Sequence, residues 1–225
     1  MIRTWEEVNS KLSSFTGDAE REGKELRFPV KLRIDGWNWA QKMLCAHTPR
    51  SRKMDLVIDT NNRSAVLPDD FYAVEGVYHK GKEKWLRPMR RTPGDVMYVE
   101  DDLPEYWVWA NSMYLEFRAE YETSDITLLY WAYYPDIEYD EDINLTQNQV
   151  YVPNWSIGGL LHLTMAYCWT PGAVMAADIN EYKINVDAGN PLQNPRSQQA
   201  REHLYWWNVI SDSFPHPQVV HTYGN

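Results

Sequence analysis

The sequence predicts an α+β fold: a helical core built from both ends of the chain, an inserted antiparallel β region and an extended C-terminal arm. Apolar residues recur at helical spacing before residue 50 and again after residue 150. Between these parts the pattern alternates and is broken by turn residues, as in antiparallel strands. Helices, then strands, then helices in this order favour an α+β class. We therefore expect N-terminal helices of the core over 1–50, the β region over 51–135, C-terminal helices over 136–212 and the arm over 213–225.

The N-terminal part predicts two helices. Thr4 and Glu7 have the spacing of a capping box at the start of the first helix, which should end near 16–18. The second helix starts at Pro29, since proline is favoured in a first helical turn, and should end before Pro49. Gly36 weakens this second prediction. The apolar face of the first helix consists of Trp5, Val8 and Leu12, and that of the second of Val30, Ile34, Trp37, Gln41 and Leu44.

The central part predicts short strands separated by turns. We expect strands over 54–59, 64–67, 71–79, 84–88 and 125–134, with a hairpin turn at 80–82, and one or two strands over 106–117 around Asn111-Ser112. The last strand is rich in β-branched and aromatic residues and ends at Pro135. If these strands form one sheet, its interior should contain Val57, Val74, Leu128 and Tyr130.

After the strands, an acidic connector over 136–144 leads back to helical periodicity. The helix from about Pro153 to Trp169 is apolar on nearly every side, so it should be buried. A further helix is expected from about 173 into the 180s, and a last one over 197–212. The tail after Phe214 has no periodicity.

No motif for catalysis or for a cofactor is present, so we expect neither an enzyme nor a bound cofactor. The chain lacks glycine-rich phosphate loops, a nucleophile elbow and zinc-ligand spacing. The acidic run 136–142 could offer carboxylates to calcium, but Glu141 and Gln147 occupy the positions where a calcium loop needs Gly and Glu. A solvated connector is therefore expected. We expect His162 to be a satisfied interior or interface histidine, and Cys45 and Cys168 to be buried, reduced thiols.

The composition narrows the functional classes. The net charge is −10, which argues against tight nucleic-acid binding as the main task. Neither a signal peptide nor a membrane-spanning run is recognisable, so we expect a soluble protein made in a cytoplasm. The 11 Trp and 15 Tyr, against 5 Phe, suit surfaces that become half-buried between partners, and they suit sugar-binding grooves as well.

Two regions are candidates for binding a partner. The region 80–91 is basic, with Lys80, Lys82, Lys84 and Arg87 at its start. It is compatible with a solvated hairpin tip and equally with docking on an acidic partner or on DNA phosphate. In the last helix, Ala200, Leu204 and Trp207 form the face that should pack on the core. The outward-pointing Tyr205 and Trp206, with Phe214 and His216 of the arm, complete the interface candidates.

One phrase of the sequence is distinctive. It runs from Leu67-Pro68-Asp69-Asp70-Phe71 through the strand 71–79 and returns after the basic turn as Leu86-Arg87-Pro88. This phrase resembles the head-to-tail adaptor (connector) proteins of tailed bacteriophages. The early helix around 37–49 and the later segments 126–135 and 152–169 resemble the same family in the same order. Together they cover roughly residues 4–170, whereas 88–106 and the chain after 191 match no phrase of that family.

The resemblance implies a non-enzymatic subunit of a twelve-fold ring in the virion neck, between capsid and tail. Its partners would be the portal protein, neighbouring adaptor subunits and a downstream tail or head-closure protein. Genomic DNA would pass through the lumen without sequence-specific binding, and no membrane would be involved. The residues leave two alternatives open: a carbohydrate- or receptor-binding virion module, favoured by the aromatic content, and a tail-associated hydrolase, which rests on acids that no motif places.

Overall fold

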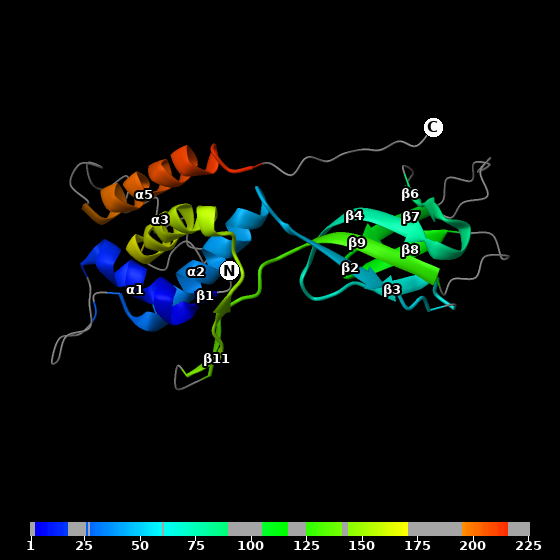
Figure 1. Cartoon of the computed structure of the whole chain (residues 1–225), viewed down its shortest axis with the longest axis horizontal. Coiled ribbons are helices and arrows are strands. Elements are labelled where there is room, and N and C mark those ends of the chain that lie inside the picture. Colours follow the sequence, from blue (N-terminus) through cyan, green and yellow to red (C-terminus); the bar gives the residue numbers. More distant parts are fainter. Residues whose placement is uncertain are drawn as a thin grey trace, which may run out of the picture. The chain divides into compact units, whose positions relative to one another are not determined.

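The computed structural model describes residues 3–17, 26, 28–59, 61–89, 105–116, 125–140, 144–170 and 195–215. These residues form both helices and sheets, which confirms the α+β class in general. The described strand pairs of the predicted antiparallel β region are antiparallel except for one, Arg87–Pro88 with Glu105–Trp109, which is parallel. The chain divides into two compact units. We call Met1–Thr48 with Tyr134–Asn225 the helical unit, and Pro49–Tyr133 the β unit (Figure 1).

The helical unit contains four described helices: α1 (Trp5–Thr16), α2 (Val30–Cys45), α3 (Ile157–Trp169) and α5 (Pro195–Ser211). α1 ends at Gly17, whose φ of 64° lies in the left-handed region that glycine adopts at no steric cost. The predicted apolar faces are confirmed, because the side chains of both are buried apart from the half-buried Val30. Thr4 precedes α1, but its side chain makes no capping hydrogen bond. The predicted capping box is therefore wrong. Thr4 belongs instead to β1 (Arg3–Thr4), which pairs with β12 (Gln149–Val150).

Two glycines set how closely the helices pack. α3 contacts both α2 and α5 (Figure 1). A Cβ atom on Gly36 of α2 would lie 3.0 Å from the Tyr167 ring and 3.2 Å from the Thr164 carbonyl oxygen of α3. A Cβ atom on Gly159 of α3 would lie 3.0 Å from the Trp207 ring of α5. Both positions need a residue without a side chain, so Gly36 is a packing requirement rather than a weakness of α2.

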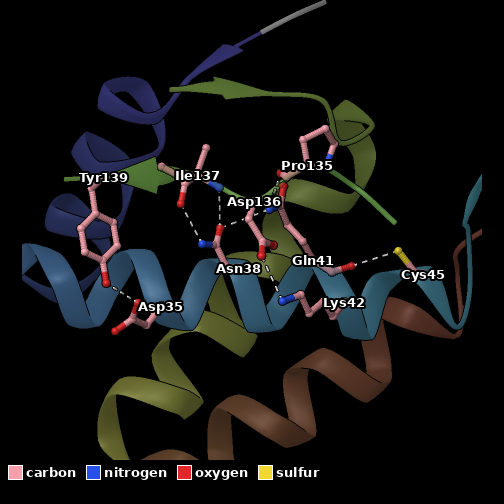
Figure 2. Close-up of polar contacts among 9 residues, drawn as sticks. All are labelled: Asp35, Asn38, Gln41, Lys42, Cys45, Pro135, Asp136, Ile137 and Tyr139. Atoms are coloured by element: carbon pink, nitrogen blue, oxygen red, sulfur yellow. Dashed lines mark hydrogen bonds and ion pairs between the residues drawn. The ribbon is translucent and has the colours of Figure 1, made fainter. Parts of the chain in front are cut away.

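The acidic connector is attached to α2, as Figure 2 shows. The Asn38 side chain donates to the Ile137 carbonyl oxygen at 2.9 Å and accepts from the Ile137 amide at 2.8 Å. Tyr139 donates its hydroxyl to Asp35 at 2.9 Å, and Lys42 lies 3.0 Å from Asp136. The Ile137 side chain is buried. The predicted solvated connector is therefore wrong for this stretch, because Asp136, Ile137 and Tyr139 contact α2 while Glu138 and Asp140 remain exposed. Its strand β10 (Glu138–Tyr139) pairs with β11 (Leu145–Gln147).

The β unit is built from two four-stranded sheets rather than the single expected sheet. The first has the order β2-β9-β4-β5 and consists of β2 (Arg50–Asp55), β9 (Ile126–Ala132), β4 (Phe71–His79) and β5 (Lys84–Trp85). The second has the order β3-β8-β7-β6 and consists of β3 (Ser64–Val66), β8 (Ser112–Glu116), β7 (Glu105–Trp109) and β6 (Arg87–Pro88). Both sheets contribute side chains to one apolar core, which includes Val77 and Leu128 from the first and Met113 and Leu115 from the second.

The expected interior of the β unit is confirmed in part. Leu128 and Tyr130 are buried, and Val74 packs half-buried against the core. Val57 is 88% exposed, so its predicted burial is wrong. The strand expected over 54–59 instead spans Arg50–Asp55, and the chain beyond it turns Leu56 inward and Val57 outward. An alternating pattern shifted by one residue reverses which side chains face the core.

The chain enters and leaves the β unit through neighbouring strands. Arg50 at the start of β2 lies opposite Ala132 at the end of β9. On the helical side, the Tyr134 hydroxyl donates to the Thr48 carbonyl oxygen at 2.8 Å. The helix expected from about 173 and the arm beyond 215 lie outside the described residues. Within the described ranges, no helix has the length and apolar character needed to cross a membrane.

Candidate functional site

Four predicted interface residues lie on one short stretch of the β unit, directly after β4. We call Lys80, Lys82, Lys84 and Arg87 the basic tip; all four are exposed. They lie on the 3-10 turn η1 (Lys80–Lys82) and on the adjoining β5 and β6. The turn closes through Glu83, whose φ is 54° and whose amide donates to the Lys80 carbonyl oxygen at 3.1 Å. The Lys80 ammonium lies 2.8 Å from Asp55, and hydrogen bonding from Lys80 holds the pKa of that carboxyl below its ordinary value.

Trp85 stands among these cations. Its side chain is 53% exposed, although Leu86 beside it is buried. The ring lies over Gly76, where a Cβ atom would come within 2.7 Å of it, and it meets the Tyr78 ring edge-on at 5.2 Å. Trp85 is therefore a fixed, exposed aromatic. Sequence reasoning missed it as a site residue, although its alternation with Leu86 indicated an outward direction.

A second aromatic surface covers the outer face of the sheet β3-β8-β7-β6, and sequence reasoning missed it. Trp107 and Tyr114 lie opposite each other on β7 and β8, with nearly parallel rings 5.3 Å apart. Trp109 follows on the same face of β7 and is 73% exposed. We call these three residues the sheet aromatics. The buried Met113 and Leu115 alternate with Tyr114, which was the signal available in the sequence.

A third surface lies on α5. Trp207 is buried, whereas Tyr205 and Trp206 are 61% and 44% exposed. This agrees with the direction predicted for each of the three side chains. Leu204 is exposed as well, so its predicted place in the packed face is wrong. Exposed Val209 extends the apolar surface by one helical turn from Tyr205. We call Leu204, Tyr205, Trp206 and Val209 the α5 face.

The structure places Phe214 differently from its prediction as part of an exposed arm. Its side chain is 4% exposed and lies against Trp207 and Trp155, with ring centroids 5.5 and 4.8 Å away. A Cβ atom on Gly159 would come within 3.1 Å of it, so α3 leaves room for this ring. Phe214 is therefore a core residue of the helical unit, and the expected boundary of the arm at 213 must be corrected. His216 lies outside the described residues.

Two histidines join α3 to α5. The Nδ1 atoms of His162 and His203 are 3.0 Å apart, so one imidazole donates to the other. Phe15 of α1 meets the His162 ring edge-on at 4.9 Å, and Trp206 lies 6.3 Å from it. Burial lowers the pKa of His162, and burial together with the nearby His162 lowers the pKa of His203 to about 4. His162 is thus satisfied, as expected, by a partner 41 residues away.

The described residues also include side chains that can bind metals and two thiols. No group of three or more His, Cys, Asp or Glu side chains among them is arranged to hold a metal ion. Cys45 and Cys168 are buried free thiols, as predicted, and burial raises the pKa of Cys168 to about 12. A thiol with this pKa is a poor nucleophile at neutral pH.

No model of a known protein family matches the sequence, and no curated protein matches it.

Proposed function

We propose that the protein is a structural, non-enzymatic virion protein: a subunit of the adaptor ring that connects the portal to the tail in the neck of a tailed phage. The observation that carries this proposal is the α5 face, where Tyr205 and Trp206 are exposed beside the buried Trp207. Aromatic side chains that are exposed in one subunit are typical anchors for a partner's pocket.

The division of the chain into a helical unit and a β unit fits the role of a ring subunit. A helical core with an inserted β region would present separate surfaces, since the α5 face lies on the helical unit and the basic tip on the β unit. A ring subunit must contact its two neighbours and the proteins above and below it, so it needs several interfaces. The order of motifs that resembles the phage adaptors adds to this support.

The test is assembly with the portal protein of the same virion. Subunit and portal are mixed at micromolar concentration and examined by electron microscopy and by co-migration in size-exclusion chromatography. We expect the wild-type protein to join the portal as a ring. The double change Tyr205→Ala and Trp206→Ala should weaken this association at least tenfold while the fold is retained.

The matched control is Trp109→Ala, which removes an exposed aromatic from the β unit. It should leave portal association near the wild-type level if the α5 face is the portal contact. No co-migration of the wild-type protein with the portal would contradict the proposed function.

A second candidate function is favoured by one observation, the sheet aromatics. Aromatic rings exposed on a sheet face suit stacking on sugar rings, as a carbohydrate- or receptor-binding virion module would require. Quenching of tryptophan fluorescence by host-surface polysaccharides would test this alternative. Saturable quenching that is lost in Trp107→Ala and kept in Trp206→Ala would favour it over the adaptor role.

A further inference from the structure

The charge of the chain is distributed very unevenly around the basic tip. The segment 80–87 contains four cations and Glu83, and so carries a net charge of +3. Because the whole chain carries −10, all the other residues together carry −13. A second copy of this chain is therefore an acidic partner for the tip of the first.

The tip is built to keep its shape when it binds. Glu83 closes the turn, and the Leu86 amide donates to the Val77 carbonyl oxygen at 2.8 Å. Trp85 is held by Gly76 and Tyr78, with about half of its surface in contact with solvent. An exposed aromatic that is near Lys84 and Arg87 in the sequence combines an apolar anchor with electrostatic steering, and a ring already held by its neighbours loses little conformational entropy when it docks.

An acidic surface of the helical unit lies on the ribbon of β10 and β11 and the residue that follows β10. Glu138 and Asp140 are exposed there, and we call them the acidic ribbon. The ribbon is held on α2 through Asn38 and Asp35 (Figure 2), so its carboxylates also have a fixed base. Asp136 lies 3.0 Å from Lys42, and both carboxylate oxygens of Asp140 accept hydrogen bonds from Asn144, at 2.7 and 3.0 Å, which fixes the Asp140 charge at the end of the ribbon.

We infer that the basic tip of one copy docks on the acidic ribbon of the next copy, so that the copies join head to tail. This inference rests on the proposed function, since a head-to-tail interface that closes on itself generates a ring. A duplex-DNA partner is less favoured, because the remaining charge of −13 would repel phosphates. The basic tip thus supplies one half of the subunit–subunit interface and the acidic ribbon the other.

Charge reversal tests the pairing. The tip variant carries Lys82→Glu and Lys84→Glu; the ribbon variant carries Glu138→Lys and Asp140→Lys. Each should associate with itself at least tenfold more weakly than the wild type, in sedimentation velocity with and without portal. A mixture of the two variants, and a chain with all four changes, should restore assembly because unlike charges meet again. Lys11→Glu, an exposed change on α1, is compared with Lys84→Glu and should assemble like the wild type.

Three outcomes would overturn the inference. One is wild-type assembly by the tip variant; another is failure of the mixture and of the fourfold variant to assemble. The third is tight binding of duplex DNA that the tip variant loses, which would assign the tip to phosphates. These results leave the proposed function standing. Absence of any wild-type assembly, alone or with the portal, would refute the inference and the proposed function together.

Discussion

The histidine pair between α3 and α5 predicts that the helical unit loses stability in mild acid. In the neutral pair, one imidazole donates its proton to the other across 3.0 Å. A first added proton leaves that hydrogen bond possible, whereas a second would set two N–H groups against each other at the same distance. The rings of Phe15 and Trp206 lie 4.9 and 6.3 Å from that of His162, so part of its surroundings is apolar. Glu202 opposes the effect by favouring a charged His162.

The sign and size of this loss of stability follow from the pKa of His203. Its pKa is about 4 in the folded protein, against an ordinary value of 6.5. The folded state therefore favours the neutral ring, and this stabilisation is fully present above pH 6.5. This stabilisation is lost as the pH falls from 6.5 toward 4. Below pH 4, His203 causes no further change in the free energy of unfolding. The shift corresponds to about 3 kcal/mol without solvent screening, and screening at this half-buried position reduces it to about 1–2 kcal/mol.

The assay is urea unfolding at pH 7, 6, 5 and 4 for the wild type and for His203→Gln, which keeps a hydrogen-bonding side chain but cannot titrate. Subtracting the variant's free energy of unfolding from that of the wild type removes the contribution of the carboxylates common to both. The difference should fall by about 1–2 kcal/mol between pH 7 and pH 4. Hydrogen exchange of α5 peptides, measured in parallel, should show faster opening at pH 4. A difference that stays constant over this range would refute the reasoning.

Three further substitutions, and Val57→Ala as a control, test packing and attachment. Leu128→Ala should cost the β unit about 2–5 kcal/mol in urea unfolding, because it empties a fully buried position, whereas Val57→Ala at an exposed position should cost less than about 0.5 kcal/mol. Phe214→Ala should lower the stability of the helical unit by about 3 kcal/mol in the same assay, and wild-type stability would show that this ring is not core. Asn38→Ala should leave the Ile137 amide and carbonyl without their side-chain partner and cost about 1–3 kcal/mol. It should also speed hydrogen exchange at that amide, and unchanged exchange would count against the attachment of the connector to α2.

The helices were predictable because their signal is local. Trp5, Val8 and Leu12 fall on one face by spacing alone, and the same face is buried in the structure. The strand Phe71–His79 was also predicted with its observed ends, since Pro68 and the turn at 80–82 bracket it. These elements are determined by residues within one or two turns of each other.

The remaining features depend on partners distant in sequence. The direction of Val57 depends on which face of its segment meets the second sheet, and the alternating pattern alone allows either face. Gly36 appeared unfavourable until the neighbouring helix showed why no side chain fits there. The pairing of His162 with His203 joins residues 41 positions apart, so neither flanking sequence could indicate it.

The paired strands at the boundary between the two units have a consequence for how such a protein can be rebuilt. Residues facing each other across an antiparallel pair have Cα atoms about 5 Å apart, and Arg50 faces Ala132 in this way. If residues 49–133 were excised, the new chain ends would be Thr48 and Tyr134. A short linker could therefore join them. Because Tyr134 is bonded to Thr48 on the helical side, that host would keep its own closure after the cut. Grafting a foreign domain between Thr48 and Tyr134 should therefore give a chimaera that keeps the helical scaffold.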